Sequence, residues 1–175
     1  IFSINKVVTR MSLTDPKTSK TVDFDDSKLA KMDADGKYIN STNFVIEYKL
    51  SVTNEGSVAG YVKKIVDNVP SQFKFSTDSN PNWYLGNNGE VYNTSLANTI
   101  INPGETKEVT LVLTKKMSET GDGIVHNTAE ITEVYNEYGL ENIIKQDTTK
   151  QAADVIIGIK TGREIIYISL IFVII

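Results

Sequence analysis

The sequence predicts an all-β fold, an antiparallel β-sandwich, and two features of the chain lead to this prediction. Apolar and polar residues alternate along residues 44–53 and 109–114, which is the pattern of strands buried on one face only. Turn sequences separate such segments: Asn88-Gly89 suits a tight hairpin turn, and Asn102-Pro103-Gly104 suits a type II turn. No segment combines a helical repeat of apolar residues with capping residues. Several short strands between turns therefore favour a sandwich.

The alternation places ten strands along the chain. They are expected at residues 2–10, 20–24, 28–32, 37–40, 44–53, 60–68, 73–76, 90–93, 107–115 and 124–135. The polar segment from Tyr138 to Thr149 is expected to be a linker. The apolar patch from Ala153 to Gly162 fits either a late edge strand or an extended approach to a membrane.

The 175 residues are enough for one domain with its own core. We expect a sandwich at 1–138, a linker and juxtamembrane segment at 139–163, and the start of a transmembrane helix at 164–175. The run from Ile165 to Ile175 carries no charge, and the chain does not begin with Met. We therefore interpret the sequence as part of a longer protein, in which a spanning helix of about 20 apolar residues is cut short. A buried C-terminal strand is the alternative, since Ile and Val favour strands.

The composition argues against several functions. The net charge is −4, whereas nucleic-acid binders usually carry a basic patch. Cysteine is absent and His126 is the single histidine, which excludes disulfides, thiolate metal sites, cysteine nucleophiles and sites with several histidines. We expect no metal, no cofactor and no nucleic-acid partner, and we do not expect an enzyme.

Three polar residues fall where the alternation requires apolar ones, namely Lys6, Asp67 and Asn127. Each is flanked, two positions away on both sides, by apolar residues, so each is expected to point into the core. Burying an unpaired ammonium or carboxylate is costly. Burial also lowers the pKa of a lysine and raises that of an aspartate, so both groups tend towards their neutral forms.

A neutral amine beside a carboxylic acid and an amide is a reactive set. The amine of Lys6 can attack the amide carbon of Asn127, while Asp67 polarises the carbonyl and moves protons. Ammonia leaves, and the product is an intramolecular isopeptide bond. Asp67 would assist only this internal cross-link.

Four segments carry a resemblance to a known family. They are FVIEYKLSVTN at 44–54, YVKKIVDNVP at 61–70, INPGETKEVTLVLT at 101–114 and HNTAEIT at 126–132. In this order they resemble the immunoglobulin-like repeat domain of bacterial cell-surface proteins, related to the CnaA-like modules of Gram-positive adhesins and pilins. The resemblance covers about residues 1–138 and implies an immunoglobulin-like sandwich in a structural or adhesive surface protein. The tail AADVIIGIKTGRE and the apolar run after it look like the membrane-proximal end of such proteins.

The resemblance also implies roles for the three polar residues. In cross-linked relatives, a lysine on the first strand joins an asparagine on the last, with help from an aspartate on a middle strand. Lys6, Asn127 and Asp67 match these positions. Many domains of the wider family keep the Asn-Thr-Ala run and form no bond. No LPxTG-type sorting signal is present, so the expected anchor is the C-terminal membrane helix.

Simpler interpretations remain for the same residues. Lys6 and Asp67 could form an ion pair without a covalent bond, and Asn127 could bind buried backbone groups. Glu47 is a rival acid, although the alternation turns it outward. A second function class is a binding module that recognises a carbohydrate or a host protein through the loop around Trp83 and Tyr84, because exposed aromatic residues serve such surfaces. A secreted hydrolase is a third class, with only weak carboxylate candidates.

Overall fold

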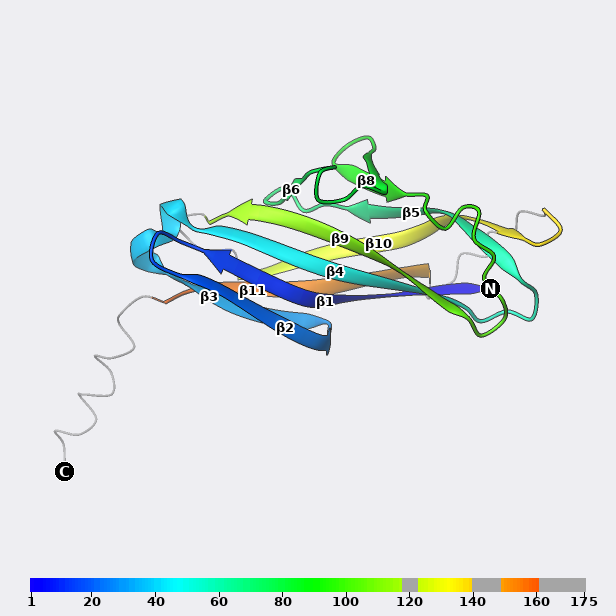
Figure 1. Cartoon of the computed structure of the whole chain (residues 1–175), viewed down its shortest axis with the longest axis horizontal. Coiled ribbons are helices and arrows are strands. Elements are labelled where there is room, and N and C mark those ends of the chain that lie inside the picture. The colour runs from blue at the N-terminus through cyan, green and yellow to red at the C-terminus, as the bar shows by residue number, and fades with distance from the viewer. Residues whose placement is uncertain (118–122, 140–148, 161–175) are drawn as a thin grey trace, which may run out of the picture.

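The computed structural model describes residues 1–117, 123–139 and 149–160. These residues form an all-β sandwich of two sheets that pack face to face (Figure 1). The elements are β1 (Phe2–Thr14), β2 (Ser19–Ser27), β3 (Leu29–Asp35), the 3₁₀ helix η1 (Gly36–Ser41), β4 (Asn43–Asn54), β5 (Gly60–Asn68), β6 (Lys74–Phe75), β7 (Trp83–Leu85), β8 (Glu90–Asn93), β9 (Thr106–Lys116), β10 (Gly123–Asn136) and β11 (Lys150–Lys160).

Sheet order brings distant parts of the chain together. One sheet has the order β2-β1-β4-β9-β6, and the other has the order β3-β11-β10-β5-β8-β7. Every strand pair is antiparallel except β3 and β11, which run parallel. Across the core, β1 packs against β10 and β11 of the opposite sheet. The first strand therefore faces the last two strands of the described chain.

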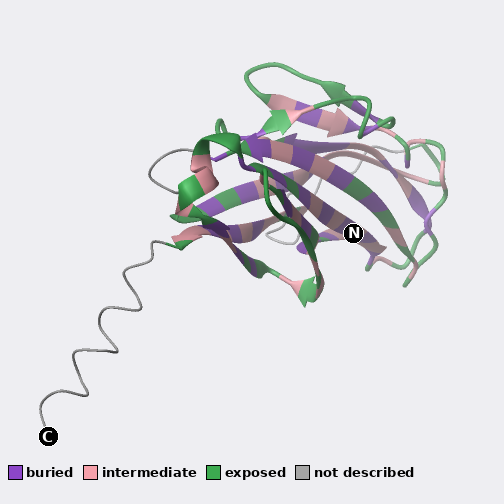
Figure 2. Ribbon diagram, turned by 60° about the vertical axis from the view of Figure 1, so that its left-hand side comes forward, coloured by how far each residue is buried: buried purple, intermediate pink, exposed green. Residues whose placement is uncertain are grey.

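Alternating side chains build the core between the sheets. On β4, Phe44, Ile46, Tyr48, Leu50 and Val52 have no exposed surface, while the residues between them face outward at least in part. The same alternation runs along the other long strands, as the banding in Figure 2 shows. Burial of these apolar faces is the main force that holds the two sheets together.

Two of the expected turns have the required backbone geometry. Asn88 and Gly89 both adopt positive φ, of 56° and 82°, as a tight hairpin turn needs. In the turn that begins at Asn102, Gly104 has a φ of 77° and the N–H of Glu105 donates to the carbonyl of Asn102. This is the type II arrangement that the Pro103-Gly104 pair favours.

A β-bulge lengthens β1 beyond the expected end at residue 10. Val8 pairs with Tyr48 and Arg10 pairs with Glu47, so Thr9 is the extra residue. Before the bulge even-numbered residues point inward, and after it Met11 does. A bulge shifts the alternation by one residue, so unbroken alternation predicts an end near residue 10 although the strand continues to Thr14.

The sandwich extends past its expected boundary at residue 138. Residues 150–160, expected to be a linker and juxtamembrane segment, form β11 in the interior of a sheet, hydrogen-bonded to β10 on one side and β3 on the other. Ala153, Val155 and Ile157 are buried, so this strand completes the core. Of the two interpretations of the apolar patch, the strand is confirmed, but it lies in the interior of the sheet and not at its edge.

Smaller differences concern local structure. The strand expected at 37–40 is the 3₁₀ helix η1, which begins where the Asp35 side chain accepts a hydrogen bond from the N–H of Lys37. β7 was not expected, because its three residues are too few to show alternation.

The expected transmembrane helix at 164–175 lies outside the described residues. Within the described part of the chain, no helix is long and apolar enough to cross a membrane.

Candidate functional site

Lys6, Asp67 and Asn127 are all fully buried, as the alternation predicts. Lys6 comes from β1 in one sheet, whereas Asp67 from β5 and Asn127 from β10 belong to the other. The inward side chains of the two sheets meet in the core, so the lysine approaches the aspartate from the opposite side. The Lys6 Nζ donates a short hydrogen bond to Oδ2 of Asp67.

Strand register explains why Asp67 and Asn127 face the same side. Asp67 pairs with Ala129 across β5 and β10, and Asn127 lies two residues before Ala129, on the same face of the sheet. Diagonal neighbours of this kind lie within reach of one another. On the other side of β10, Asn127 pairs with the small, buried Ala153 of β11, which leaves room for the amide.

Burial changes the acid–base properties of the pair. Desolvation lowers the pKa of the Lys6 ammonium from 10.5, against the opposing effect of the Asp67 charge. Desolvation also raises the pKa of the Asp67 carboxyl from 3.8, against the opposing effects of Lys6 and Asn127. Both shifts favour the form in which the proton sits on Asp67 and Lys6 is a neutral amine. That amine is a nucleophile, and that carboxyl is an acid.

Asn127 stands apart from the other buried asparagines. Among the described residues, neither side-chain atom of its amide makes a hydrogen bond of ordinary geometry, although polar contacts with Asp67 and Tyr48 affect the pKa of both groups. Asn54, Asn80 and Asn93 are also buried, but all three amides make hydrogen bonds. The Asn80 side chain, for example, both donates to and accepts from the backbone of Val112. Within the described chain, Asn127 therefore makes no hydrogen bond to a buried backbone group, which differs from one of the simpler interpretations.

Tyr48 belongs to the same cluster and was missed by the sequence analysis. It is the diagonal neighbour of Lys6, because Lys6 pairs with Leu50 and Val8 pairs with Tyr48. The Lys6 ammonium lies 4.6 Å from the centre of its ring. Its hydroxyl is buried and, within the described chain, has no hydrogen-bond partner. In the sequence, a tyrosine within an apolar row is indistinguishable from an ordinary core residue. Only the structure shows that its hydroxyl is buried.

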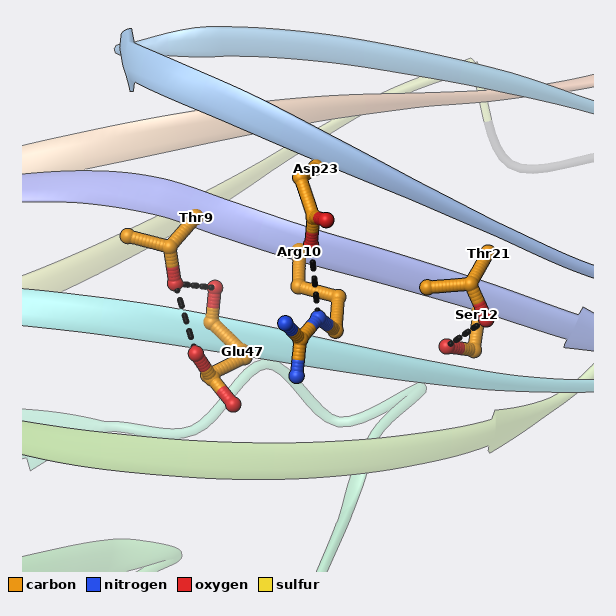
Figure 3. Close-up of polar contacts among 6 residues, drawn as sticks. All are labelled: Thr9, Arg10, Ser12, Thr21, Asp23 and Glu47. Carbon is orange, nitrogen blue, oxygen red and sulfur yellow. Dashed lines mark hydrogen bonds and ion pairs between the residues drawn. The ribbon is translucent and has the colours of Figure 1, made fainter.

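Glu47, the rival acid, lies outside this cluster. Figure 3 shows it on the outer face of the sheet, where its carboxylate accepts a hydrogen bond of 2.9 Å from the Thr9 hydroxyl. Beside it, the Arg10 Nε donates to Asp23 on β2 over 2.7 Å. The outward orientation that the alternation predicts for Glu47 is confirmed.

Trp83 is a core residue and not a surface aromatic. Its side chain is 2% exposed, and its indole N–H donates to the carbonyl of Thr110 over 2.7 Å. Tyr84 is 48% exposed and stacks on Tyr92. The expectation that the loop offers Trp83 to a ligand is wrong, because the Asn80–Trp83 turn folds the indole inward.

In the described part of the chain, no group of three or more His, Asp or Glu side chains could hold a metal ion.

No model of a known protein family matches the chain, and no curated protein matches it in sequence. Among solved structures it is similar to CaCohA2 from Clostridium acetobutylicum, with 10% identity, a TM-score of 0.44, and coverage of 89% of this chain and 92% of the other. The CARDB domain of a Pyrococcus furiosus protein shows 14% identity and a TM-score of 0.37, over 90% and 96% of the two chains. The collagen-binding domain of a Staphylococcus aureus adhesin shows 9% identity and a TM-score of 0.34, over 71% and 93%.

Proposed function

We propose that this chain is a structural, adhesin-type module of a bacterial cell-surface protein. In this proposal the sandwich is a membrane-proximal stalk that holds other domains away from the membrane, and a covalent bond between Lys6 and Asn127 closes it. The sequence resemblance supports the surface role. The buried cluster supports the bond.

The observation that carries the proposal is a set of buried polar groups that is costly as it stands. An ion pair in the core contributes little net stability, because desolvation offsets the attraction between the charges. A buried polar group without a partner costs about 1–3 kcal/mol, and the cluster holds such atoms on Asn127, Asp67 and Tyr48. Replacing such a buried pair with apolar residues of the same volume is often neutral or stabilising. A reaction between Lys6 and Asn127 would explain why these polar groups are buried, whereas packing alone does not.

The chemistry balances without any added reactant. The neutral Nζ of Lys6 attacks Cγ of Asn127, and the π electrons of the carbonyl move onto Oδ1. Asp67 hydrogen-bonds Oδ1, accepts a proton from Nζ and delivers one to Nδ2. The Cγ–Nδ2 bond then breaks, ammonia leaves, and the carbonyl reforms as a secondary amide between the two side chains. Asp67 ends in its starting protonation state. Because each chain reacts once, the event is maturation and not enzymatic turnover.

The bond would join the first strand to a strand of the opposite sheet and enclose almost the whole sandwich. Closing a loop of roughly 100 residues with a disulfide stabilises a protein by about 5 kcal/mol in the chain-entropy picture, and an isopeptide cross-link acts on the unfolded chain in the same way. Pulling on the N-terminal segment would then load a covalent link in place of the hydrogen bonds of β1. This suits a stalk that has no cysteine for disulfides.

Intact-mass spectrometry of the purified, denatured chain tests the bond. We expect a mass lower than the calculated value by one ammonia, and a branched peptide after digestion that contains both Lys6 and Asn127. The branched peptide is essential, because the Asn88-Gly89 sequence can also lose ammonia by closing to a succinimide.

Two variants and two matched controls complete the test. Lys6→Met and Asn127→Ala should restore the full calculated mass, whereas Lys20→Met and Asn68→Ala, at exposed positions, should keep the loss of ammonia. A folded wild-type chain with the full mass and no branched peptide would contradict the proposed bond. The surface location is tested separately by antibody labelling of intact and permeabilised cells, where labelling only after permeabilisation would contradict it.

A further inference from the structure

The Tyr48 hydroxyl is a buried hydrogen-bond donor, and packing does not explain why a hydroxyl lies at this position. The Tyr48 side chain has no exposed surface, and its hydroxyl has no hydrogen-bond partner among the described residues. Its neighbours along the inner row of β4 are all apolar, with Phe44 and Ile46 before it and Leu50 and Val52 after it. A phenylalanine would fill the same space and bury no polar atom.

The hydroxyl lies beside the groups that would react. The ring is packed against the Nζ of Lys6. Burial, followed by the charge of Asp67, raises the pKa of the phenol, and a polar contact with the Asn127 side chain, which falls short of ordinary hydrogen-bond geometry, opposes that rise. Asn127 also acts on Asp67. The amide thus lies within the electrostatic reach of both a phenol and a carboxyl, while the amine approaches from the opposite sheet.

Asp67 and Tyr48 can play different roles in the reaction between the amine and the amide. When an amine attacks an amide carbon, negative charge develops on the carbonyl oxygen, and a donor already aimed at that oxygen lowers the barrier. The described cluster offers two such donors, the protonated Asp67 and the Tyr48 hydroxyl. Asp67 is also needed to carry a proton from Nζ to Nδ2. A second donor that keeps its own proton would hold the oxyanion while Asp67 completes that transfer.

We propose that the Tyr48 hydroxyl donates a hydrogen bond to Oδ1 of Asn127 as Lys6 attacks, and so acts as a catalytic oxyanion donor in the cross-linking reaction. This inference rests on the proposed isopeptide bond and assigns a further residue to it. Tyr48 gains and loses no proton overall. After ammonia leaves, its hydroxyl remains bonded to the carbonyl oxygen of the new amide, so the donor is satisfied in the product.

The test measures the rate of cross-linking and not only its end point. Full-length chains made by cell-free synthesis are quenched in denaturant before they react, diluted to start folding, and sampled over time for the branched peptide. Tyr48→Phe keeps the ring against Lys6 and removes only the hydroxyl. We expect it to fold with the same Trp83 fluorescence as the wild type and to cross-link at least tenfold more slowly. Tyr92→Phe, on the outer face, should match the wild type.

A graded substitution separates donation from packing. Fluorinated tyrosine at position 48 has a more acidic hydroxyl in nearly the same volume, so it is a stronger donor and should cross-link faster than Tyr48→Phe by tenfold or more. Equal rates for wild type, Tyr48→Phe and fluorotyrosine would overturn the role of Tyr48 and leave the proposed bond intact. Absence of the branched peptide from the folded wild type would overturn both.

Discussion

Lys6 and Asp67 come from opposite sheets, and the Nζ of one meets the carboxyl of the other where neither side chain has any exposed surface. The pair thus bridges the two halves of the sandwich through its core. In that position the lysine is desolvated and paired with Asp67, and Asn127 lies on β10, the strand next to the one that carries Asp67. Several measurements can separate a structural pair from a reacting one.

Asn127→Ala should lower the free energy of unfolding by about 5 kcal/mol, because the variant cannot close the covalent loop. The substitution itself should cost little, since it removes an amide that has no partner in the described structure. Urea unfolding followed by Trp83 fluorescence measures the difference. Asn68→Ala, next to Asp67 but exposed, is the control. Equal midpoints for wild type and Asn127→Ala would show that no covalent loop forms.

The rate of cross-linking should rise and then fall with pH. The reactive state of the Lys6–Asp67 pair holds one proton, so acid adds a second and leaves an ammonium that cannot attack. Alkali removes the shared proton and leaves a carboxylate that cannot act as an acid. Because burial lowers the pKa of Lys6 from 10.5 and raises that of Asp67 from 3.8, both limbs belong to the coupled pair. Chains diluted from denaturant into buffers of different pH give the profile, and a rate that rises steadily through the range of free lysine would contradict it.

β11 should be indispensable to the fold. A chain that ends after Tyr138 should not fold, because β10 and β3 lose their shared neighbour and the core loses Val155. Circular dichroism and fluorescence would show an unfolded chain. A point-mutant pair gives a finer comparison: Val155→Asp places a charge in the core, whereas Ile156→Asp faces outward and is partly exposed. Equal stability of the two variants would mean that β11 does not occupy this position.

Trp83→Phe should destabilise the sandwich by about 1–3 kcal/mol, since it leaves the Thr110 carbonyl without its indole donor and a smaller ring in the core. Tyr84→Phe, at an exposed position, should change stability by less than about 0.5 kcal/mol. Urea unfolding followed by circular dichroism compares them. If Trp83→Phe were as stable as the wild type, the indole would not be part of the core.

Much of the fold follows from alternation alone. Local sequence predicts the apolar faces of β4 and β9 and the turns at Asn88 and Asn102, because each depends only on neighbouring residues. The bulge at Thr9 and the interior position of β11 are not predicted in this way. The first depends on how two strands are paired, and the second on which distant strands a short apolar patch joins.

The same distinction holds for the site. The inward direction of Lys6, Asp67 and Asn127 follows from their alternation with apolar residues, and their burial is confirmed. That Lys6 bonds Asp67 across the sheets depends on tertiary packing. Among residues 1–117, 123–139 and 149–160, the Asn127 amide and the Tyr48 hydroxyl make no hydrogen bond of ordinary geometry, and this depends on the tertiary packing around them, which no local pattern contains.

The placement of β11 divides the sandwich into two mechanical parts. In Figure 1 the start of β1 and the end of β11 lie at opposite ends of the long axis, so a pull on both ends would shear strands lengthwise. A Lys6–Asn127 link would carry that tension from β1 directly into β10 and shield everything between the two residues. β11 lies beyond the link and is held only by hydrogen bonds and packing. In the proposed stalk, β11 would therefore yield first under load, and since the core depends on it, the covalent link would then limit the extension to the residues outside the loop that it closes.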